Sequence, residues 1–74
     1  MPKIPIVSAI KVIKVLSKIG YEADHQTGSH IILRHKETPH KRLTVPNHKE
    51  IARGTLKVIL EEAGLTVQEF TDLL

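Results

Sequence analysis

The amino-acid sequence predicts one α+β domain over residues 1–74, in the order α-β-β-β-α with a short C-terminal helix. Apolar residues recur at helical spacing toward both ends of the chain, and three short stretches between them are alternating or β-branched. Glycines and prolines separate these stretches. Strands joined by short turns pair antiparallel, so we expect a three-stranded sheet with the helices packed on one of its faces.

The first helix is expected between Ser8, a suitable N-cap, and Gly20, a suitable C-terminal stop. The apolar side chains of its inner face are Ile10, Ile13, Leu16 and Ile19, widened by Val12 and Val15. Lysines occupy the remaining narrow stripe. An apolar face this wide predicts burial against a sheet, and it also fits a surface for a protein partner.

Three strands are expected over residues 21–25, 29–35 and 42–45. In the first, Tyr21, Ala23 and His25 are predicted to face the same way, and the turn that follows is centred on Thr27-Gly28. The third strand ends before Pro46, which cannot continue a hydrogen-bonded ladder.

The second helix is expected to begin near Gly54 and to end at Gly64. Its inner face is predicted to consist of Leu56, Ile59, Leu60 and Ala63. The sequence Thr66-Val67-Gln68-Glu69 is a capping box, and it predicts the start of the short terminal helix.

The net charge of +3 hides a segregation of charge along the chain. Residues 1–20 hold four lysines and no acid, and residues 34–57 hold seven basic residues against two acids. Residues 58–74 hold four acids and no base. A basic body of this kind favours a polyanionic partner, with nucleic acid first among the candidates. The only aromatic residues, Tyr21 and Phe70, are expected in the core, which leaves Lys and Arg contacts to the phosphate backbone.

Several functional classes find no support in the sequence. Apolar runs are too short to span a membrane, lysines interrupt the N-terminal apolar stretch, and cysteine is absent, so we expect a cytoplasmic protein. P-loop, dinucleotide-binding and nucleophile-elbow motifs are missing, and no cofactor is expected. Two neighbouring histidines are too few ligands for zinc, so no metal site is expected either.

Two histidines are the candidates for chemistry. The predicted turn pairs His25 with His30 on one face, with Cβ atoms about 5 Å apart. His30 follows Gly28-Ser29, where the backbone can approach a phosphate, and a neutral imidazole can take a proton from a ribose 2′-hydroxyl. A strand histidine without a chemical task is the commoner use of such a position, so position alone leaves both roles open.

The remaining histidines are expected to be structural or solvated. His48 ends the sequence Val45-Pro46-Asn47-His48, where it can shape the loop through a hydrogen bond or assist at the site. His35 and His40 lie in a basic, turn-rich stretch, and we expect both in solvent.

Four blocks of residues, in order over residues 20–64, resemble the HicA toxins, the mRNA interferases of bacterial and archaeal toxin–antitoxin pairs. The blocks are Gly20-Tyr21 after a helix, Gly28-Ser29-His30, Val45-Pro46-Asn47-His48, and Gly54-Thr55-Leu56 with Ile59-Leu60 and Ala63-Gly64. Gly-Ser-His alone would be a weak signal, whereas the four ordered blocks are specific.

This resemblance implies a fold like that of double-stranded-RNA-binding domains, ribosome-independent cleavage of mRNA, and inhibition by a HicB-type antitoxin that covers the active site. The family's catalytic histidine corresponds to His30, and Gly28 and Ser29 belong to the same motif. The basic residues expected to hold the RNA backbone are Lys36, Lys41, Arg42, Lys49 and Arg53, with Lys57 as a further candidate.

One position departs from the family, because relatives carry arginine where this chain has His25; a phosphate contact there would depend on pH. The second proton donor stays open among His25, His48 and a lysine. A non-catalytic RNA-binding module of the same fold is the alternative function, and a protein-interaction module that uses the first helix is a third.

Overall fold

The computed structural model describes residues 3–74, and its elements follow the predicted order, with two helices after the third strand. The elements are α1 (Ala9–Lys18), β1 (Tyr21–Thr27), β2 (His30–His35), β3 (Arg42–Pro46), α2 (Arg53–Ala63) and α3 (Val67–Leu73). The strands form one antiparallel sheet in the order β1-β2-β3, which confirms the predicted α+β class.

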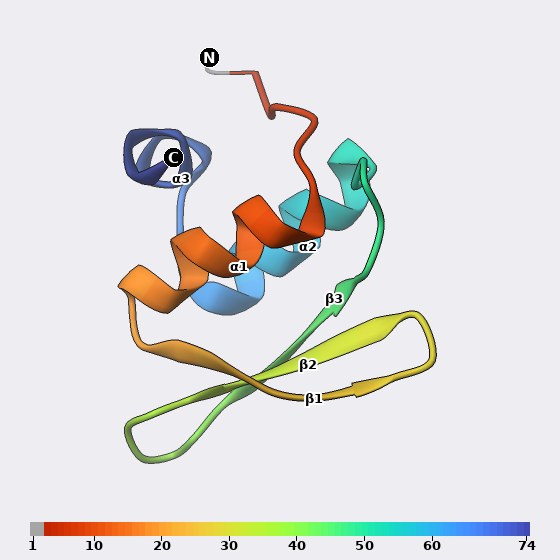
Figure 1. Ribbon diagram of the computed structural model, residues 1–74. Helices are drawn as coiled ribbons and strands as arrows, with labels where there is room; N and C mark the ends of the chain where they lie inside the picture. Colours follow the sequence, from red (N-terminus) through yellow and green to blue (C-terminus); the bar gives the residue numbers. More distant parts are fainter. Residues whose placement is uncertain (1–2) are drawn as a thin grey trace.

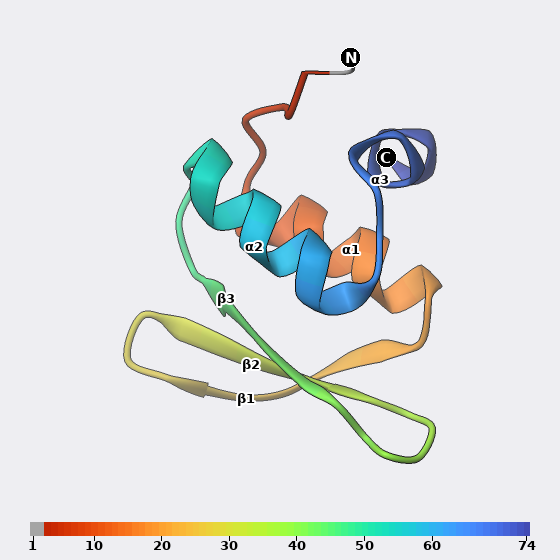
Figure 2. The same ribbon diagram turned by 180° about the vertical axis from the view of Figure 1, so that it is seen from behind.

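The three helices lie on the same side of the sheet, and none of residues 3–74 covers its other side (Figure 1). The view from behind shows the same two layers, with α2 in front of α1 (Figure 2). The core fills the space between the helices and the sheet and extends between α3 and the other two helices; its largest fully buried side chains are Phe70, Leu16, Leu33, Ile51, Leu56, Leu60, Val12, Val15 and Val45. Tyr21 and Phe70 are both buried, as expected, so neither ring can stack on a base.

The caps of the helices follow from local sequence, as predicted. Ser8 is extended, and its hydroxyl accepts a hydrogen bond from the Lys11 N–H. Thr66 and Glu69 form the reciprocal capping box that starts α3. Gly64 adopts the left-handed conformation that ends α2.

The buried face of α1 differs from the prediction. Its buried side chains are Ala9, Val12, Val15 and Leu16, whereas Ile10 is 64% exposed and Ile13 and Ile19 are only partly buried. Apolar residues occupy most of the circumference of this helix, so their spacing permits more than one inner face. Contact with the sheet selects the face centred on Val12 and Leu16.

The turn between β1 and β2 is also displaced from its predicted place. Thr27 pairs with His30, so the turn consists of Gly28 and Ser29 rather than being centred on Thr27-Gly28. Gly28 has a φ of 55°, which suits the first central position of a tight hairpin turn. As a consequence His25 lies opposite Ile32, and the predicted direct pairing of His25 with His30 is wrong.

A β-bulge changes the face on which His25 lies. Ala23 pairs with Leu33 and His25 pairs with Ile32, so Asp24 is an extra residue in β1. Leu33 is buried on the helix side of the sheet, and Ile32, its neighbour in β2, faces the opposite way. His25 therefore lies on the uncovered face, and the prediction that it shares a face with Tyr21 and Ala23 is wrong.

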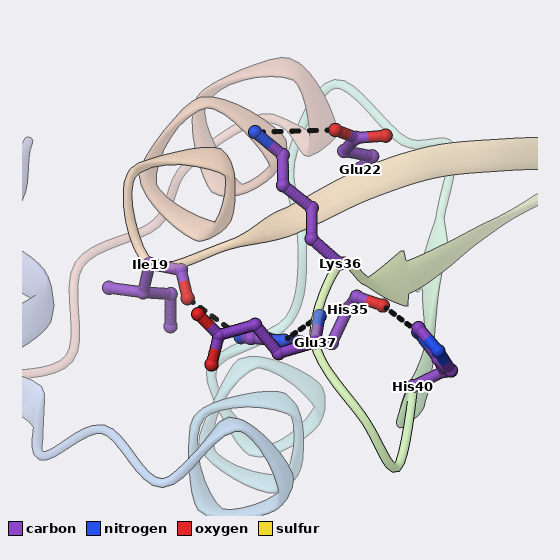
Figure 3. Close-up of polar contacts among 6 residues, drawn as sticks. All are labelled: Ile19, Glu22, His35, Lys36, Glu37 and His40. Atoms are coloured by element: carbon purple, nitrogen blue, oxygen red, sulfur yellow. Dashed lines mark hydrogen bonds and ion pairs between the residues drawn. The ribbon is translucent and has the colours of Figure 1, made fainter.

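His35 is a structural residue, which corrects the expectation that it lies in solvent. Its Nε2 is 2.9 Å from the Ile19 carbonyl oxygen, and its Nδ1 accepts a hydrogen bond from the Glu37 N–H at 3.1 Å (Figure 3). The ring packs edge-on against Tyr21, with ring centroids 4.8 Å apart. These contacts hold the end of β2 against the connection between α1 and β1.

His40 is exposed, as expected, but its ring is not merely solvated. Its Nδ1 lies 3.0 Å from the His35 carbonyl oxygen and donates a hydrogen bond to it within the β2–β3 connection (Figure 3). His40 also has a φ of 56°, in the left-handed region that side chains seldom adopt. The hydrogen bond ties the ring to the end of β2.

Gly20→Ala is expected to lower the free energy of unfolding by at least about 1 kcal/mol. The φ of Gly20 is 104°, and a Cβ atom there would lie 2.6 Å from Nε2 of His35. Gly54→Ala is the matched control, because Gly54 lies in α2 with ordinary φ and open space around it, and alanine favours a helix. Urea unfolding of both variants tests this, and equal midpoints would contradict the His35 contact.

Candidate nucleic-acid interface

The bare side of the sheet is the candidate functional surface, here called the open face. Leu33, Leu43 and Val45 point into the core, so the side chains that alternate with them point away from the helices. The side chains that the strand pairing places on the open face are Glu22, Asp24, His25, Thr27, His30, Ile32, Arg34, Arg42, Thr44 and Pro46.

His30 is the first residue of the central strand and lies on the open face. It pairs with Thr27 on one side and with Pro46 on the other, and its side chain is exposed. The Gly28-Ser29 turn immediately precedes it, and the Ser29 carbonyl accepts a hydrogen bond from the Asn47 N–H at 2.7 Å. The turn and the start of the β3–α2 loop therefore border His30 at one end of the sheet.

Two arginines form the basic part of the open face. Arg34 of β2 pairs directly with Arg42 of β3, and both side chains are exposed. Like charges directly opposite each other in a sheet repel, and the carboxylates of Glu22, which pairs with Arg34, and of Asp24 offset part of that repulsion. Arg34 lies four residues from His30 along β2, which corresponds to roughly 13 Å. An extended phosphate backbone can contact the arginine pair and His30 together.

The structure does not bring the other expected RNA-binding residues together. Lys36 pairs with Glu22 at 3.3 Å at the edge of the open face, and both partners are exposed. Lys41 lines a cleft of about 380 Å³ on the helix side, together with Tyr21 and His35. Lys41 therefore faces away from His30.

The remaining basic candidates lie outside the open face. Arg53 begins α2, and its Nε donates a hydrogen bond to the Ile4 carbonyl at 2.9 Å. Lys57 is exposed on the same helix. Lys49 is exposed in the β3–α2 loop, beyond the strand end next to His30. Lys49 therefore lies in the loop at the His30 end of the sheet, whereas Arg53 and Lys57 belong to α2.

His48 contributes through its backbone. Its carbonyl accepts a hydrogen bond from the Ala9 N–H at 3.0 Å, at the first turn of α1, and its own N–H donates to the Pro46 carbonyl. The side chain is exposed. The backbone of His48 thus connects the end of β3 to the helix layer.

Asp24 and His25 form a pair that sequence reasoning missed. Oδ2 of Asp24 lies 2.9 Å from Nδ1 of His25, and their side chains are 40% and 50% exposed. The hydrogen bond from His25 holds the pKa of Asp24 below its usual 3.8; partial desolvation opposes this shift, and the charges of Arg34 and Arg42 reinforce it. The pair thus lies within the field of the two arginines.

Arg34 is the other functional candidate that the sequence did not single out. Its alternation with the buried Leu33 was a usable signal, because it places Arg34 on the face opposite the core. No comparable signal existed for Asp24, since regular alternation would place adjacent residues on opposite faces.

Within residues 3–74, no three His, Asp or Glu side chains are grouped in a way that could hold a metal ion. None of the helices in that range has the length and apolar character needed to cross a membrane.

The fold and the open face define a small α+β protein that presents an uncovered sheet surface with histidines and arginines. The family model of the HicA toxin of bacterial toxin–antitoxin systems matches residues 10–65, and the chain belongs to that family. It is thus a toxin of a toxin–antitoxin system, a class that acts with an antitoxin partner. No curated protein matches the chain.

Replacing His25 by alanine is expected to raise the pKa of Asp24 toward 3.8, because the hydrogen bond from His25 is the largest cause of its depression. Carboxyl ¹³C NMR over a pH series measures this, and Arg42→Gln should raise the same pKa less. A pKa below the unfolded value stabilises the fold at neutral pH, and that contribution disappears as the pH falls through the folded pKa. An unchanged Asp24 titration in the His25→Ala variant would contradict the pair.

Proposed function

We propose that this toxin is an endoribonuclease that cleaves mRNA independently of the ribosome, with His30 as its general acid/base. The observation that carries the proposal is the position of His30. It is exposed at the first residue of the central strand, on the open face that also holds Arg34 and Arg42. Family membership supports the toxin role, and the Arg34–Arg42 pair on the open face supports a polyanionic substrate.

The proposed reaction uses the RNA's own hydroxyl as nucleophile. The His30 imidazole takes the proton of a ribose 2′-hydroxyl, and the oxygen attacks the adjacent phosphorus in line. The P–O5′ bond breaks and O5′ takes up a proton from a second donor, which leaves a 2′,3′-cyclic phosphate and a 5′-hydroxyl. One side chain that transfers protons supplies about 10²–10⁴ in rate, so turnover is expected to be modest. This scheme uses no metal ion and no cofactor.

The substrate is proposed to lie along the open face. Arg34 and Arg42 hold phosphates at one end of β2, and the Gly28-Ser29 turn offers backbone close to the strand that carries His30. Gly28 has open space around its Cα, so a phosphate can approach it closely. Lys36 and Lys49 add positive charge at the two ends of this path, and Lys41 and Arg53 contribute only to the general attraction of RNA.

The antitoxin is proposed to be a HicB-type protein that covers His30 and the open face. The paired Arg34 and Arg42 attract an acidic or RNA-like partner, and electrostatic steering makes the association fast. Inhibition then follows from competition with RNA for the same side chains. A complex whose open face stayed accessible to RNA would show that inhibition works in another way.

The native chain is expected to cleave end-labelled mRNA in EDTA and to leave cyclic-phosphate ends, whereas His30→Ala should cleave about 10²–10⁴-fold more slowly. His30→Ala should bind RNA as the native chain does, because affinity comes from Lys and Arg. Circular dichroism establishes that both proteins are folded. Binding without cleavage by the native chain would favour the alternative, a non-catalytic RNA-binding module.

Arg42→Gln is expected to weaken RNA binding and to reduce the slope of log K against log salt by about 0.7, the value for one phosphate contact on a single strand. The same substitution should weaken antitoxin binding, because both partners use the open face. Lys14→Gln is the control, since Lys14 lies on the exposed side of α1, across the core from the open face. Equal losses for Arg42→Gln and Lys14→Gln would place the RNA elsewhere.

A further inference from the structure

The β-bulge in β1 produces a pair of side chains that a regular strand could not form. Adjacent strand residues point to opposite faces, yet Asp24 and His25 hydrogen-bond through their side chains at 2.9 Å. The extra residue between the Ala23 and His25 pairings brings both side chains to the open face. Bulges often re-aim a side chain next to a functional site.

The carboxylate of Asp24 defines how the His25 ring is presented. Because Oδ2 of Asp24 accepts a hydrogen bond from Nδ1, the opposite nitrogen, Nε2, is the one left to face a ligand. The ring is half exposed, so a ligand can reach it. A carboxylate in this place orients the ring and lies next to the positive charge that the ring carries when it donates a proton.

His25 and His30 lie on the same face at a spacing that suits one phosphodiester. His25 pairs with Ile32 and His30 pairs with Thr27, so the two histidines are diagonal neighbours across the β1–β2 pair. Diagonal neighbours are about 7–8 Å apart, within reach of long side chains. A phosphate placed between the two rings can therefore accept hydrogen bonds from opposite sides.

The other charged groups of the open face have partners or positions farther along the strands. Arg34 and Arg42 come from β2 and β3 and act on Asp24, while Glu22 pairs with Lys36 farther along the strands. His48, an alternative proton donor, is bonded through its carbonyl to the first turn of α1, on the helix side. Lys41 is also on the helix side. Among the described histidines, His25 is the one that the strand pairing places diagonal to His30, whereas His40 lies beside Glu22, Asp24 and Arg34.

We infer that His25 is the second acid/base of the reaction proposed above, and that Asp24 is its positioning residue. While the neutral His30 ring takes the proton from the 2′-hydroxyl and the O2′–P bond forms, the Nε2–H of the His25 imidazolium protonates O5′ as the P–O5′ bond breaks. The products are the 2′,3′-cyclic phosphate and the 5′-hydroxyl, and the two rings regain their starting protonation by exchange with water. The inference rests on the proposed ribonuclease function.

The test compares an ordinary RNA with the same RNA whose scissile 5′-oxygen is replaced by sulfur, a leaving group that needs no proton. His25→Ala and His25→Gln are expected to slow cleavage of ordinary RNA by about 10²–10⁴-fold and to cleave the sulfur substrate nearly as fast as the native chain does. Asp24→Asn should show the same pattern with a smaller loss. His30→Ala should be slow on both substrates, because the nucleophile still needs its base.

Glu22→Gln is the matched control, because it removes a carboxylate from the same strand and face without touching His25. Its ratio of rates on the two substrates should equal that of the native chain. A native rate for His25→Ala on ordinary RNA, or an equal loss on both substrates, would overturn the assignment of His25. If the ribonuclease proposal itself is wrong, the native chain will show no cleavage that depends on His30. This inference then fails together with that proposal.

Discussion

The burial of the sheet on one side only is the constraint on which the rest of this structure depends. α1 and α2 pack on the face that carries Leu33, Leu43 and Val45, and α3 packs on these two helices, so the core lies on this side of the sheet alone. Each strand residue is therefore either a core residue or a surface residue, according to its parity along the strand. In β2, buried or half-buried core residues therefore alternate with His30, Ile32 and Arg34. The proposed site consists of the strand residues that face away from the helices.

The β-bulge is the one place where β1 departs from this rule, and the departure has a chemical consequence. Without the extra residue, His25 would lie on the same side as Tyr21 and Ala23, toward the helices. With it, His25 lies diagonal to His30 and bonds to Asp24. The bulge interrupts the ladder locally, and in return the open face gains a second histidine with a fixed ring nitrogen.

Some histidines stabilise the fold, and others are exposed on the open face. His35 binds the Ile19 carbonyl and the Glu37 N–H and packs on Tyr21, so it connects the end of β2 with the chain that leaves α1 (Figure 3). This contact explains why residue 20 is a glycine, since a side chain there would collide with the ring. His25 and His30 make no such contact with the helix layer, because they lie on the opposite face. Their exposure is what makes them available to a substrate.

Much of the fold and part of the site were predictable from neighbouring residues alone. The order of elements, the caps at Ser8 and Thr66, the inner face of α2 and the place of His30 after Gly28-Ser29 depend on short-range spacing, and the structure has all of them. The HicA resemblance likewise rests on local blocks, and the family match confirms it. These features were determined by the sequence because each is decided within a few residues.

Only the tertiary structure decided the features that depend on contacts across the chain. The inner face of α1 was ambiguous because apolar residues nearly surround the helix, and packing against the sheet selected Val12 and Leu16. The bulge at Asp24 and the pairing of Arg34 with Arg42 follow from strand register, which no local pattern encodes. The role of His35 depends on a carbonyl sixteen residues away. These long-range contacts determine whether a histidine or an arginine lies in the core, on the helix side or on the open face.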